Sequence, residues 1–332
     1  MTDVTGVPAA RPPLRLGTRR SALAQSQSGW VADRLRAAGL QVELVLVTTE
    51  GDTSARSLTE IGGAGVFASA LRGALLEDRI DLAVHSLKDL PTAPSPELVV
   101  AAVPEREDPR DVLVARDGLT LAALPGGAVL GTGSPRRAAQ LRLVRPDLEV
   151  RDIRGNVDSR IQMVRDGALD GVVLARAGLS RLGRLDEVTE TLEADVMLPA
   201  AGQGALAVEC RSEDAALAEE LAGILDDPDT RAAVTAERSA LAGLEAGCTA
   251  PVGALALLER PSEDDPPGGH APAPMNLHVF AALEDRAQRR VVTGATDAPD
   301  ELGRSAAELL LNRPDPVGLV AVHGSHTPES DL

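Results

Sequence analysis

The chain has 33 lysine and arginine residues in total, and Lys88 is the only lysine among them. It lies in the apolar run Leu82–Pro91 (LAVHSLKDLP) and is followed directly by Asp89. A compact ammonium suits a site that needs a point charge where the planar guanidinium would not fit. An aspartate held ionised beside it in a water-poor cleft can stabilise a developing cation or relay a proton. The alternative is a solvated loop pair, with the lysine left over from an arginine-biased composition.

A second group of candidate residues consists of arginines in two polar turns. In Gly131–Arg137 (GTGSPRR), Ser134 is typical of a helix N-cap and Pro135 fits the first helical position. The run Arg154–Arg160 (RGNVDSR) repeats this arrangement within the locally basic stretch 131–165. Helix-end amides together with arginines form a receptor for carboxylates or phosphates. Each turn could also be a merely solvated helix start, but the repetition favours an anion site.

One of the two cysteines, Cys248, lies in the turn-rich run Leu244–Gly253 (LEAGCTAPVG). Neighbouring glycine and proline indicate an exposed, tightly turned loop, where an accessible thiol could serve as a covalent anchor or a nucleophile. The alternative of a structural cysteine stays open. Cys210 ends an apolar strand and is interpreted as a buried small hydrophobe. Two cysteines are too few for a disulfide framework or a zinc site, so we predict no metal.

The composition disfavours several classes of function. The net charge of −17 argues against nucleic acid as a partner of the whole molecule. Aromatic residues make up 1% of the chain, so the exposed rings on which single-stranded nucleic acid stacks are scarce. Residues 1–13 lack the apolar core of a signal peptide, and no run of about 18 apolar residues is present to span a bilayer. We therefore expect a cytoplasmic protein that binds neither nucleic acid nor membrane.

The first half of the chain alternates apolar strands with helical segments, the pattern of an α/β sheet covered on both faces. Ser21 is a plausible N-cap for a helix to about Ala38, and the glycine-rich run 62–65 leads into a helix to about Glu77. The predicted strands are Leu14–Leu16, Val42–Val47, Leu82–His85 and Leu98–Val103. The charged, proline-flanked run Pro104–Arg110 is interpreted as a hinge between two domains.

A second α/β run follows, with helices expected to begin near Ser134 and Asn156. Its predicted strands are Val112–Ala115, Ala128–Gly131, Leu148–Ile153 and Gly171–Leu174. The run Leu198–Ala205 is interpreted as a second crossing, after which Ala205–Glu209 returns as a strand to the first sheet. Ligands of such folds bind at the carboxyl ends of the strands, and the polar runs of both halves follow strands. We therefore expect these runs to converge on one cleft.

From Thr230 the sequence changes to a small α+β unit. A helix is expected to about Leu244 and another from Asp300 to Leu311, with strands at Val252–Leu258, Leu277–Leu283 and Arg290–Val292. The run 259–275, rich in proline, glycine and acidic residues, is expected to form a flexible loop. The predicted domains are lobe 1 at 14–104 with 205–224, lobe 2 at 110–198 and a third unit at 228–325, after a disordered N-terminal extension at 1–13.

Taken in order, eight motifs between Leu14 and Leu311 resemble the hydroxymethylbilane synthase, or porphobilinogen deaminase, family. These motifs are TRRSALAQ, GGAGVF, VHSLKDLP, EREDPRD, GTGSPRR, RGNVDSR, LPAAGQGALAVECR and LEAGCTAPVG. The resemblance implies two lobes like those of type II periplasmic binding proteins and a small α+β third domain. It also implies a transferase of tetrapyrrole and heme biosynthesis. The family joins four porphobilinogen molecules head to tail, releases ammonia at each addition and hydrolyses off the linear hydroxymethylbilane.

The resemblance also assigns roles to individual residues. It implies a dipyrromethane cofactor, assembled from the substrate and tied by a thioether to Cys248. Asp89 matches the catalytic carboxylate, which hydrogen-bonds pyrrole N–H groups and stabilises the azafulvene formed when ammonia leaves. The positions that match cofactor-binding residues are Lys88, Asp89, Ser134, Arg136, Arg137 and Arg160. The positions that match the substrate site are Arg19, Ser21, Arg154, Arg181, Gln203 and Phe67.

Some features depart from the family pattern. Glu60 and Ala64 stand where many relatives carry lysines, so an ion pair between that loop and the substrate is in doubt. By resemblance we expect a monomer. The competing hypothesis is a non-catalytic, two-lobed protein that binds a small anion, which would keep the arginines but would have no use for Asp89 or Cys248.

Overall fold

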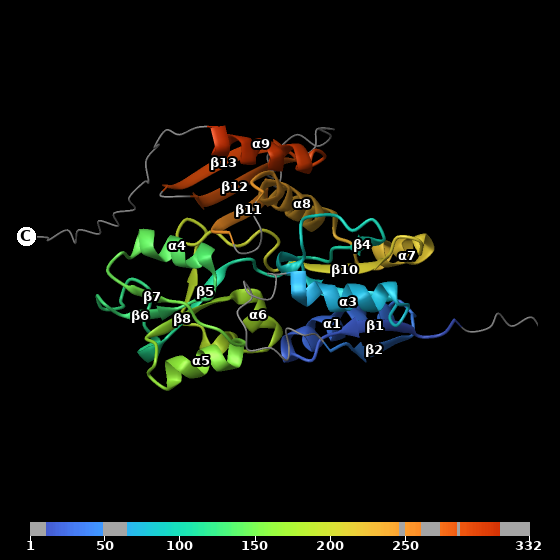
Figure 1. Cartoon of the computed structure of the whole chain (residues 1–332), viewed down its shortest axis with the longest axis horizontal. Coiled ribbons are helices and arrows are strands. Elements are labelled where there is room, and N and C mark those ends of the chain that lie inside the picture. The colour runs from blue at the N-terminus through green and yellow to red at the C-terminus, as the bar shows by residue number, and fades with distance from the viewer. Residues whose placement is uncertain (1–10, 49–64, 246–249, 260–272, 284–285, 313–332) are drawn as a thin grey trace, which may run out of the picture.

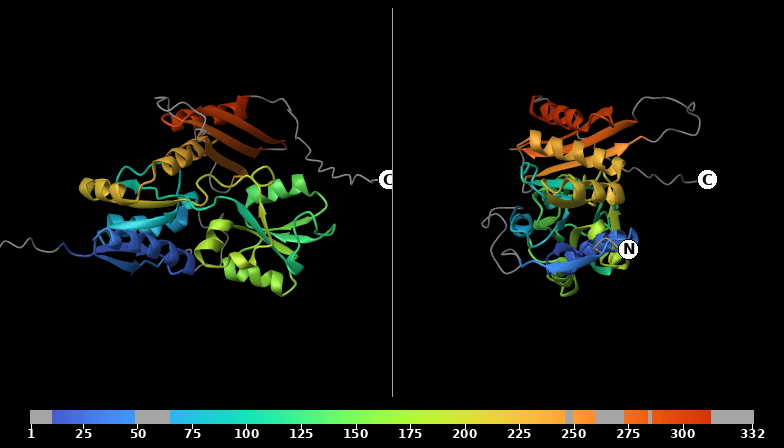
Figure 2. Two further views of the ribbon diagram at one scale, coloured as in Figure 1. Left: turned by 180° about the vertical axis from the view of Figure 1, so that it is seen from behind. Right: turned by 90° about the vertical axis from the view of Figure 1, so that its right-hand side faces the viewer.

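The structure is a computed structural model of the chain and describes residues 11–48, 65–245, 250–259, 273–283 and 286–312. These residues form three separate sheets. Two α/β lobes lie side by side, and a smaller unit built on the third sheet packs over both (Figures 1 and 2). No helix in the described part of the chain has the length and apolar character needed to cross a membrane.

The first lobe is a five-stranded sheet with the spatial order β2-β1-β3-β10-β4. Its strands are β1 (Leu14–Thr18), β2 (Val42–Leu46), β3 (Leu82–Ser86), β4 (Leu98–Ala102) and β10 (Leu206–Arg211). Its helices are α1 (Ala22–Ala37), α3 (Gly65–Leu76) and α7 (Ala215–Leu225). Helices α1 and α7 cover one face of the sheet through Val31, Leu35 and Leu221. Leu71 and Leu75 of α3 pack on the other face, so both faces are buried, as an α/β sheet requires.

The second lobe is a five-stranded sheet with the order β7-β6-β8-β5-β9. Its strands are β5 (Asp111–Ala115), β6 (Val129–Gly131), β7 (Glu149–Arg151), β8 (Gly171–Ala175) and β9 (Glu190–Leu192). Its helices are α4 (Pro135–Val144), α5 (Val157–Arg165) and α6 (Arg176–Arg181). Leu141 of α4 packs on one face, while Ile161 of α5 and Leu179 of α6 pack on the other.

The two lobes share one topology although their sequences show no evident repeat. In each sheet four strands run in one direction and one runs in the other, which is β10 in the first lobe and β5 in the second. Each antiparallel strand is the one that the chain enters after crossing from the other lobe. Each crossing therefore leads into an interior strand of the sheet that runs opposite to its neighbours.

The two crossing segments lie against each other. The amide of Glu107 donates to the carbonyl of Gly204 at 3.3 Å. Gly204 has a φ of +89°, and a Cβ built there would collide with the carbonyl oxygen of Glu107. Glycine is therefore required at this point by both the backbone conformation and the close approach.

The third unit is an antiparallel sheet of β11 (Val252–Leu258), β12 (Pro274–Leu283) and β13 (Arg286–Ala295). One face is covered by α8 (Pro228–Gly243) and α9 (Pro299–Asn312). Its core is built from small and aliphatic side chains such as Ala240, Leu277 and Ala306. This matches the aromatic-poor composition of the chain.

The predicted fold class, two α/β lobes with a small α+β unit, is confirmed by this architecture. Helices α6 and α7 and the short edge strand β9 were not predicted from the sequence. Pro274 and Met275 were expected in a loop, whereas both belong to β12 and Met275 pairs with Leu258. Alternating apolar residues such as Met275, Leu277 and Val279 mark the buried face of β12, whereas β13 has no fully buried residue and its full length follows from its pairing with β12.

Candidate functional site

The predicted site residues come directly after parallel strands of their sheets. Arg19 follows β1, Lys88 follows β3 and Ser134 follows β6. Parallel strands present their carboxyl ends at one edge of a sheet, so each lobe carries its candidate residues on one edge.

Lys88 and Asp89 lie in a short 3₁₀ turn, Leu87–Asp89, that follows β3. The turn is fixed to the second crossing because the amide of Leu87 donates to the carbonyl of Ala205 at 3.0 Å. Lys88 donates from Nζ to Oε1 of Gln203 at 3.3 Å. Burial lowers the pKa of Lys88 to about 8, partly offset by the negative charge of Asp89. The lysine therefore loses its charge more readily than a solvated lysine.

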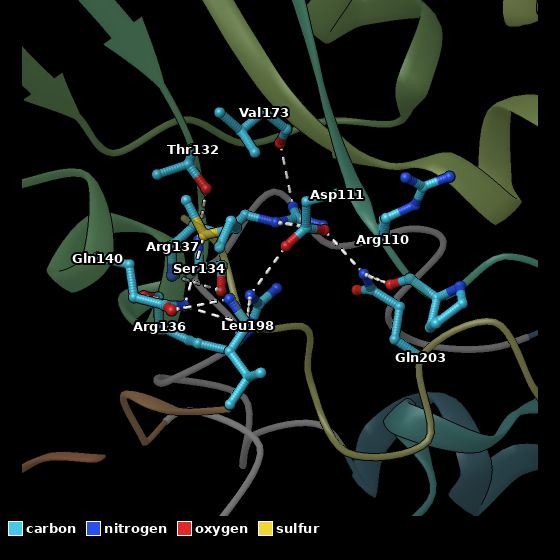
Figure 3. Close-up of polar contacts among 12 residues, drawn as sticks. Arg110, Asp111, Thr132, Ser134, Arg136, Arg137, Gln140, Val173, Leu198 and Gln203 are labelled. Carbon is cyan, nitrogen blue, oxygen red and sulfur yellow. Dashed lines mark hydrogen bonds and ion pairs between the residues drawn. The ribbon is translucent and has the colours of Figure 1, made fainter. Parts of the chain in front are cut away.

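Asp111, at the start of β5, is a fully buried carboxylate that binds two guanidiniums (Figure 3). Its Oδ2 lies 2.8 Å from Nη1 of Arg136, and its Oδ1 lies 2.7 Å from Nη2 of Arg137. Burial alone would raise the pKa of Asp111, but the two arginines hold this pKa well below its usual range. Arg137 also donates to the carbonyl of Val173 at 3.1 Å. Both arginines are therefore held in place before any ligand binds.

Gln203 connects this group to Lys88. Its side chain is buried, and Nε2 donates to Oδ1 of Asp111 at 2.8 Å and to the carbonyl of Pro109 at 2.7 Å (Figure 3). Its Oε1 accepts the bond from Lys88. A continuous polar chain therefore runs from the first lobe, through the second crossing, to the second lobe.

A second chain of contacts reaches Arg136 from the third unit. Arg289 of β13 donates to Oε1 of Gln140 at 2.8 Å and to the carbonyls of Ala194, Asp195 and Val196. Gln140 accepts from the amide of Leu198 at 2.8 Å and donates to its carbonyl at 3.0 Å (Figure 3). The same carbonyl accepts from Nη1 of Arg136 at 2.5 Å.

The N-terminal ends of α4 and α5 form a positively charged edge of the second lobe. Ser134 caps α4 through the amide of Arg137, and Asn156 caps α5 through the amide of Ser159. Arg160 lies beside this turn, since a Cβ built on Gly133 would be 3.7 Å from its Nη2. Burial, and then the positive charges of Arg137 and Arg154, lower the pKa of Arg160 to about 10. An anion bound at this edge would relieve that repulsion.

Several arginines of the basic stretch 131–165 are already paired with acidic side chains, so fewer of them can bind a ligand than the composition suggests. Arg145, Arg151 and Arg165 pair with Asp147, Glu149 and Glu187 respectively. Arg136 and Arg137 are paired with Asp111, which lies outside the stretch. Arg160 and the exposed Arg154, whose guanidinium is 3.5 Å from Asp152, are therefore the better candidates for direct contact with a ligand.

The remaining candidates are Arg19 and Ser21 of the first lobe and Arg181 of α6. Ser21 caps α1 by accepting from the amide of Ala24 at 3.3 Å. Arg19 is half-buried just before it. Arg181 donates to the carbonyl of Gly204 at 2.6 Å, and burial lowers its pKa. Ser26 of α1 donates to the carbonyl of Arg181 at 2.7 Å, which joins the two lobes.

The predicted hinge 104–110 lacks regular structure but is held by ion pairs. Arg106 binds both carboxylate oxygens of Glu237 on α8, at 2.6 and 3.0 Å. Glu237 is fully buried and also accepts from the amides of Gly202 at 2.7 Å and Ala256 at 2.9 Å. This one carboxylate therefore joins both crossings to the third unit.

Cys248 and the side chain of Phe67 lie outside the described residues, as do Glu60 and Ala64. The predicted burial of Cys210 is confirmed, and burial raises the pKa of this thiol to about 11.

Asp111, Glu237, Gln140 and Arg289 were not predicted from the sequence. A signal existed for Asp111, because this acid begins the apolar run DVLVA. Two adjacent arginines in a packed helix need such a counter-charge. The other three residues lie on helices and strands where nothing in the local pattern marks them.

Two protein families match successive parts of the chain, and both are described as domains of porphobilinogen deaminase. Residues 14–219 match the family described as porphobilinogen deaminase, dipyromethane cofactor binding domain. Residues 231–312 match the family described as porphobilinogen deaminase, C-terminal domain.

Among individual relatives, porphobilinogen deaminase from Nocardia farcinica is 57% identical over 308 residues, covering 92% of this chain and 88% of the relative. Porphobilinogen deaminase 1 from Streptomyces coelicolor is 64% identical over 250 residues, covering 74% of this chain and 78% of the relative.

Solved structures with a similar fold include the methionine binding protein MetQ, with a TM-score of 0.41 and 12% identity over 63% of this chain and 87% of that chain. A substrate-binding domain of a putative amino acid transporter from Streptococcus pneumoniae has a TM-score of 0.42 and 13% identity, over 64% of this chain and 91% of that one.

Proposed function

The chain belongs to the porphobilinogen deaminase family, and from this premise we propose how its own residues carry out the family's reaction. Its activity is that of a hydroxymethylbilane synthase, a transferase of tetrapyrrole biosynthesis that joins porphobilinogen units head to tail and releases ammonia. The observation that carries the residue assignments is the polar chain from Lys88 through Gln203 to Asp111 and its two arginines.

The described residues fit a dipyrromethane, whose acetate and propionate groups are carboxylates. Burial, and then the charges of neighbouring guanidiniums, lower the pKa of Arg160 to about 10, so a bound anion would stabilise its charged form. Nε of Arg136 is buried and makes no hydrogen bond within the described part of the chain. Ser134 places the N-terminus of α4 beside them, where helix amides favour negative charge. When bound, the dipyrromethane supplies the chain end to which the first substrate unit is added.

Within this site we assign carboxylate binding to Lys88, Ser134, Arg136, Arg137 and Arg160. Lys88 is oriented by Gln203 and Arg160 by the carbonyl of Gly155. Arg136 and Arg137 are oriented by Asp111. Since Asp111 neutralises one of the two guanidinium charges, the pair retains net positive charge for a ligand. Preorganised donors bind an anion without the entropic cost of ordering them.

The catalytic role belongs to Asp89 in this proposal. When ammonia leaves, positive charge develops on the methylene carbon and spreads into the pyrrole of the substrate. A carboxylate in a partly buried turn, next to the pyrrole N–H, stabilises that charge and can accept the proton lost when aromaticity is restored. The incoming substrate would be bound by Arg19, Ser21, Arg154 and Arg181, with Phe67 packed beside it. The buried amide of Gln203 acts by positioning Lys88 and Asp111.

The thioether to Cys248 is also part of the proposal. Residues 250–254, which follow Cys248 in the sequence, lie beside the anion site, since the amide of Ala254 donates to the carbonyl of Pro199 at 2.9 Å. A Cβ built on Gly253 would be 2.9 Å from the carbonyl oxygen of Leu198, the acceptor of Arg136. Gly253 follows Cys248 by five positions in the sequence, and its contact with the acceptor of Arg136 supports the proposed attachment.

Intact-mass measurement of the purified protein tests the assignment. We expect the wild type to carry the added mass of one dipyrromethane and to gain further pyrrole units on incubation with porphobilinogen. Cys248→Ala should carry none, whereas Cys210→Ala, the matched control at the buried cysteine, should remain loaded. An unmodified wild type that binds small anions would instead support a non-catalytic binding protein.

For the cellular setting we propose a cytoplasmic monomer whose partner is porphobilinogen. The net charge of −17 supports the absence of nucleic acid as a partner. Size-exclusion chromatography with light scattering checks the monomer, which would give one species of 34.4 kDa.

A further inference from the structure

Arg238 of α8 caps the turn that carries Lys88 and Asp89, although it belongs to the third unit. Its Nη1 donates to the carbonyls of Leu87 at 3.2 Å and Leu90 at 2.9 Å, and its Nη2 donates to the carbonyl of Pro91 at 2.7 Å. A planar guanidinium is suited to bind several carbonyls that converge in this way.

The turn is also held from its other side by the second crossing. Leu87 donates its amide to Ala205, and Gly202 approaches so closely that a Cβ there would be 3.1 Å from Cγ of Leu87. The side chains of Leu87 and Leu90 are buried in one apolar cluster with Val234, which lies one helical turn before Arg238 on α8. Apolar packing therefore seats the turn on α8, and Arg238 sets its backbone orientation.

Two adjacent residues of α8, Glu237 and Arg238, bind two different parts of the site. Glu237 binds Arg106 and the amide of Gly202 in the two crossings. Arg238 binds the Lys88–Asp89 turn. The same helix ends at Gly243, just before the segment that contains Cys248.

We propose that Arg238 is a positioning residue that fixes the Lys88–Asp89 turn relative to the helix leading to Cys248. This inference rests on the proposed function of Asp89 and Cys248. Its consequence is that loss of Arg238 displaces the catalytic carboxylate from the end of the bound chain without removing any group that touches the substrate.

The test compares Arg238→Gln with Arg231→Gln, a matched control on the same helix. Arg231 binds Asp226 and the carbonyl of Ala101 at 3.0 Å, away from the turn. For Arg238→Gln we expect kcat to fall by about 10- to 100-fold with KM nearly unchanged and with dipyrromethane still loaded, because small misplacements of reacting groups are costly. Arg231→Gln should keep kcat, and Arg238→Lys should recover part of it because an ammonium can still serve one or two carbonyls.

A second readout is independent of turnover. Lys88 is the one lysine of the chain, so labelling lysine with ¹³C at Cε gives a single NMR signal that reports this turn. Arg238→Gln should shift that signal and Arg231→Gln should not. The proposal is overturned if the Lys88 signal is unmoved in Arg238→Gln, or if both variants lower kcat equally in proportion to lost stability. A wild type without turnover would refute the proposed function, while the NMR comparison would still decide whether Arg238 positions the turn.

Discussion

The side-chain amide of Gln203 donates to the buried carboxylate of Asp111 at 2.8 Å, joining the second crossing to the first strand of the second lobe. The other end of the same amide accepts from Lys88 of the first lobe. An amide is suited to this place because it can donate to a carboxylate and accept from an ammonium at the same time. If the two lobes move apart at this point, at least one of these two hydrogen bonds must break.

The ionisation of Lys88 provides a direct test of this arrangement. In the Cys248→Ala protein, which should lack the cofactor, the ¹³C signal of Lys88 should titrate with a midpoint of about 8, because burial disfavours the ammonium. Below that pH the lysine is charged and can bind a carboxylate; as pH rises through it, anion binding weakens. In the loaded wild type, nearby carboxylates should raise the midpoint. A midpoint near the ordinary value of about 10.4, as in the urea-unfolded control, would contradict the buried placement.

Replacement of Asp89 by asparagine tests the catalytic carboxylate. Asp89→Asn keeps the size of the side chain but removes the negative charge that offsets the developing cation, so we expect turnover to fall by about 100-fold or more. Circular dichroism and the unfolding midpoint should stay close to wild type. Asp33→Asn, which removes an exposed carboxylate paired with Arg36 on α1, is the control and should keep its activity. Near wild-type product formation by Asp89→Asn would exclude the assigned role.

Much of this arrangement can be predicted from the sequence, because strand ends, helix caps and local charge are local properties. Ser21, Ser134 and Asn156 cap their helices as expected, and Lys88 follows its strand. The pairing of Arg136 and Arg137 with Asp111 was not predicted. An acid at the start of an apolar strand indicates a candidate counter-ion, but its partners depend on segments that meet only in the folded sheet. The antiparallel placement of β10 and β5 depends in the same way on how the crossings approach.

The pairing with Asp111 changes what is expected of Arg137. Arg137→Leu removes a proposed carboxylate ligand and also leaves the buried Asp111 with one guanidinium in place of two. We therefore expect little dipyrromethane by intact mass and a loss of unfolding free energy of about 3–5 kcal/mol, the usual cost of leaving a buried charge poorly compensated. Arg142→Leu on the exposed face of the same helix is the control. A fully loaded and active Arg137→Leu protein would refute both roles.

Replacement of Glu237 by glutamine tests how the third unit is held to the lobes. Glu237→Gln removes the charge opposite Arg106 but keeps the size of the side chain, so the buried guanidinium loses its counter-ion. We expect unfolding free energy from urea titration to fall by about 3–5 kcal/mol. Glu220→Gln, which breaks the more exposed pair with Arg11, should change it by about 0–1 kcal/mol. Amide exchange should increase in the crossings around Arg106 and Gly202, since both lose a bond to the same carboxylate; equal effects of the two substitutions would show that Glu237 does not join these segments.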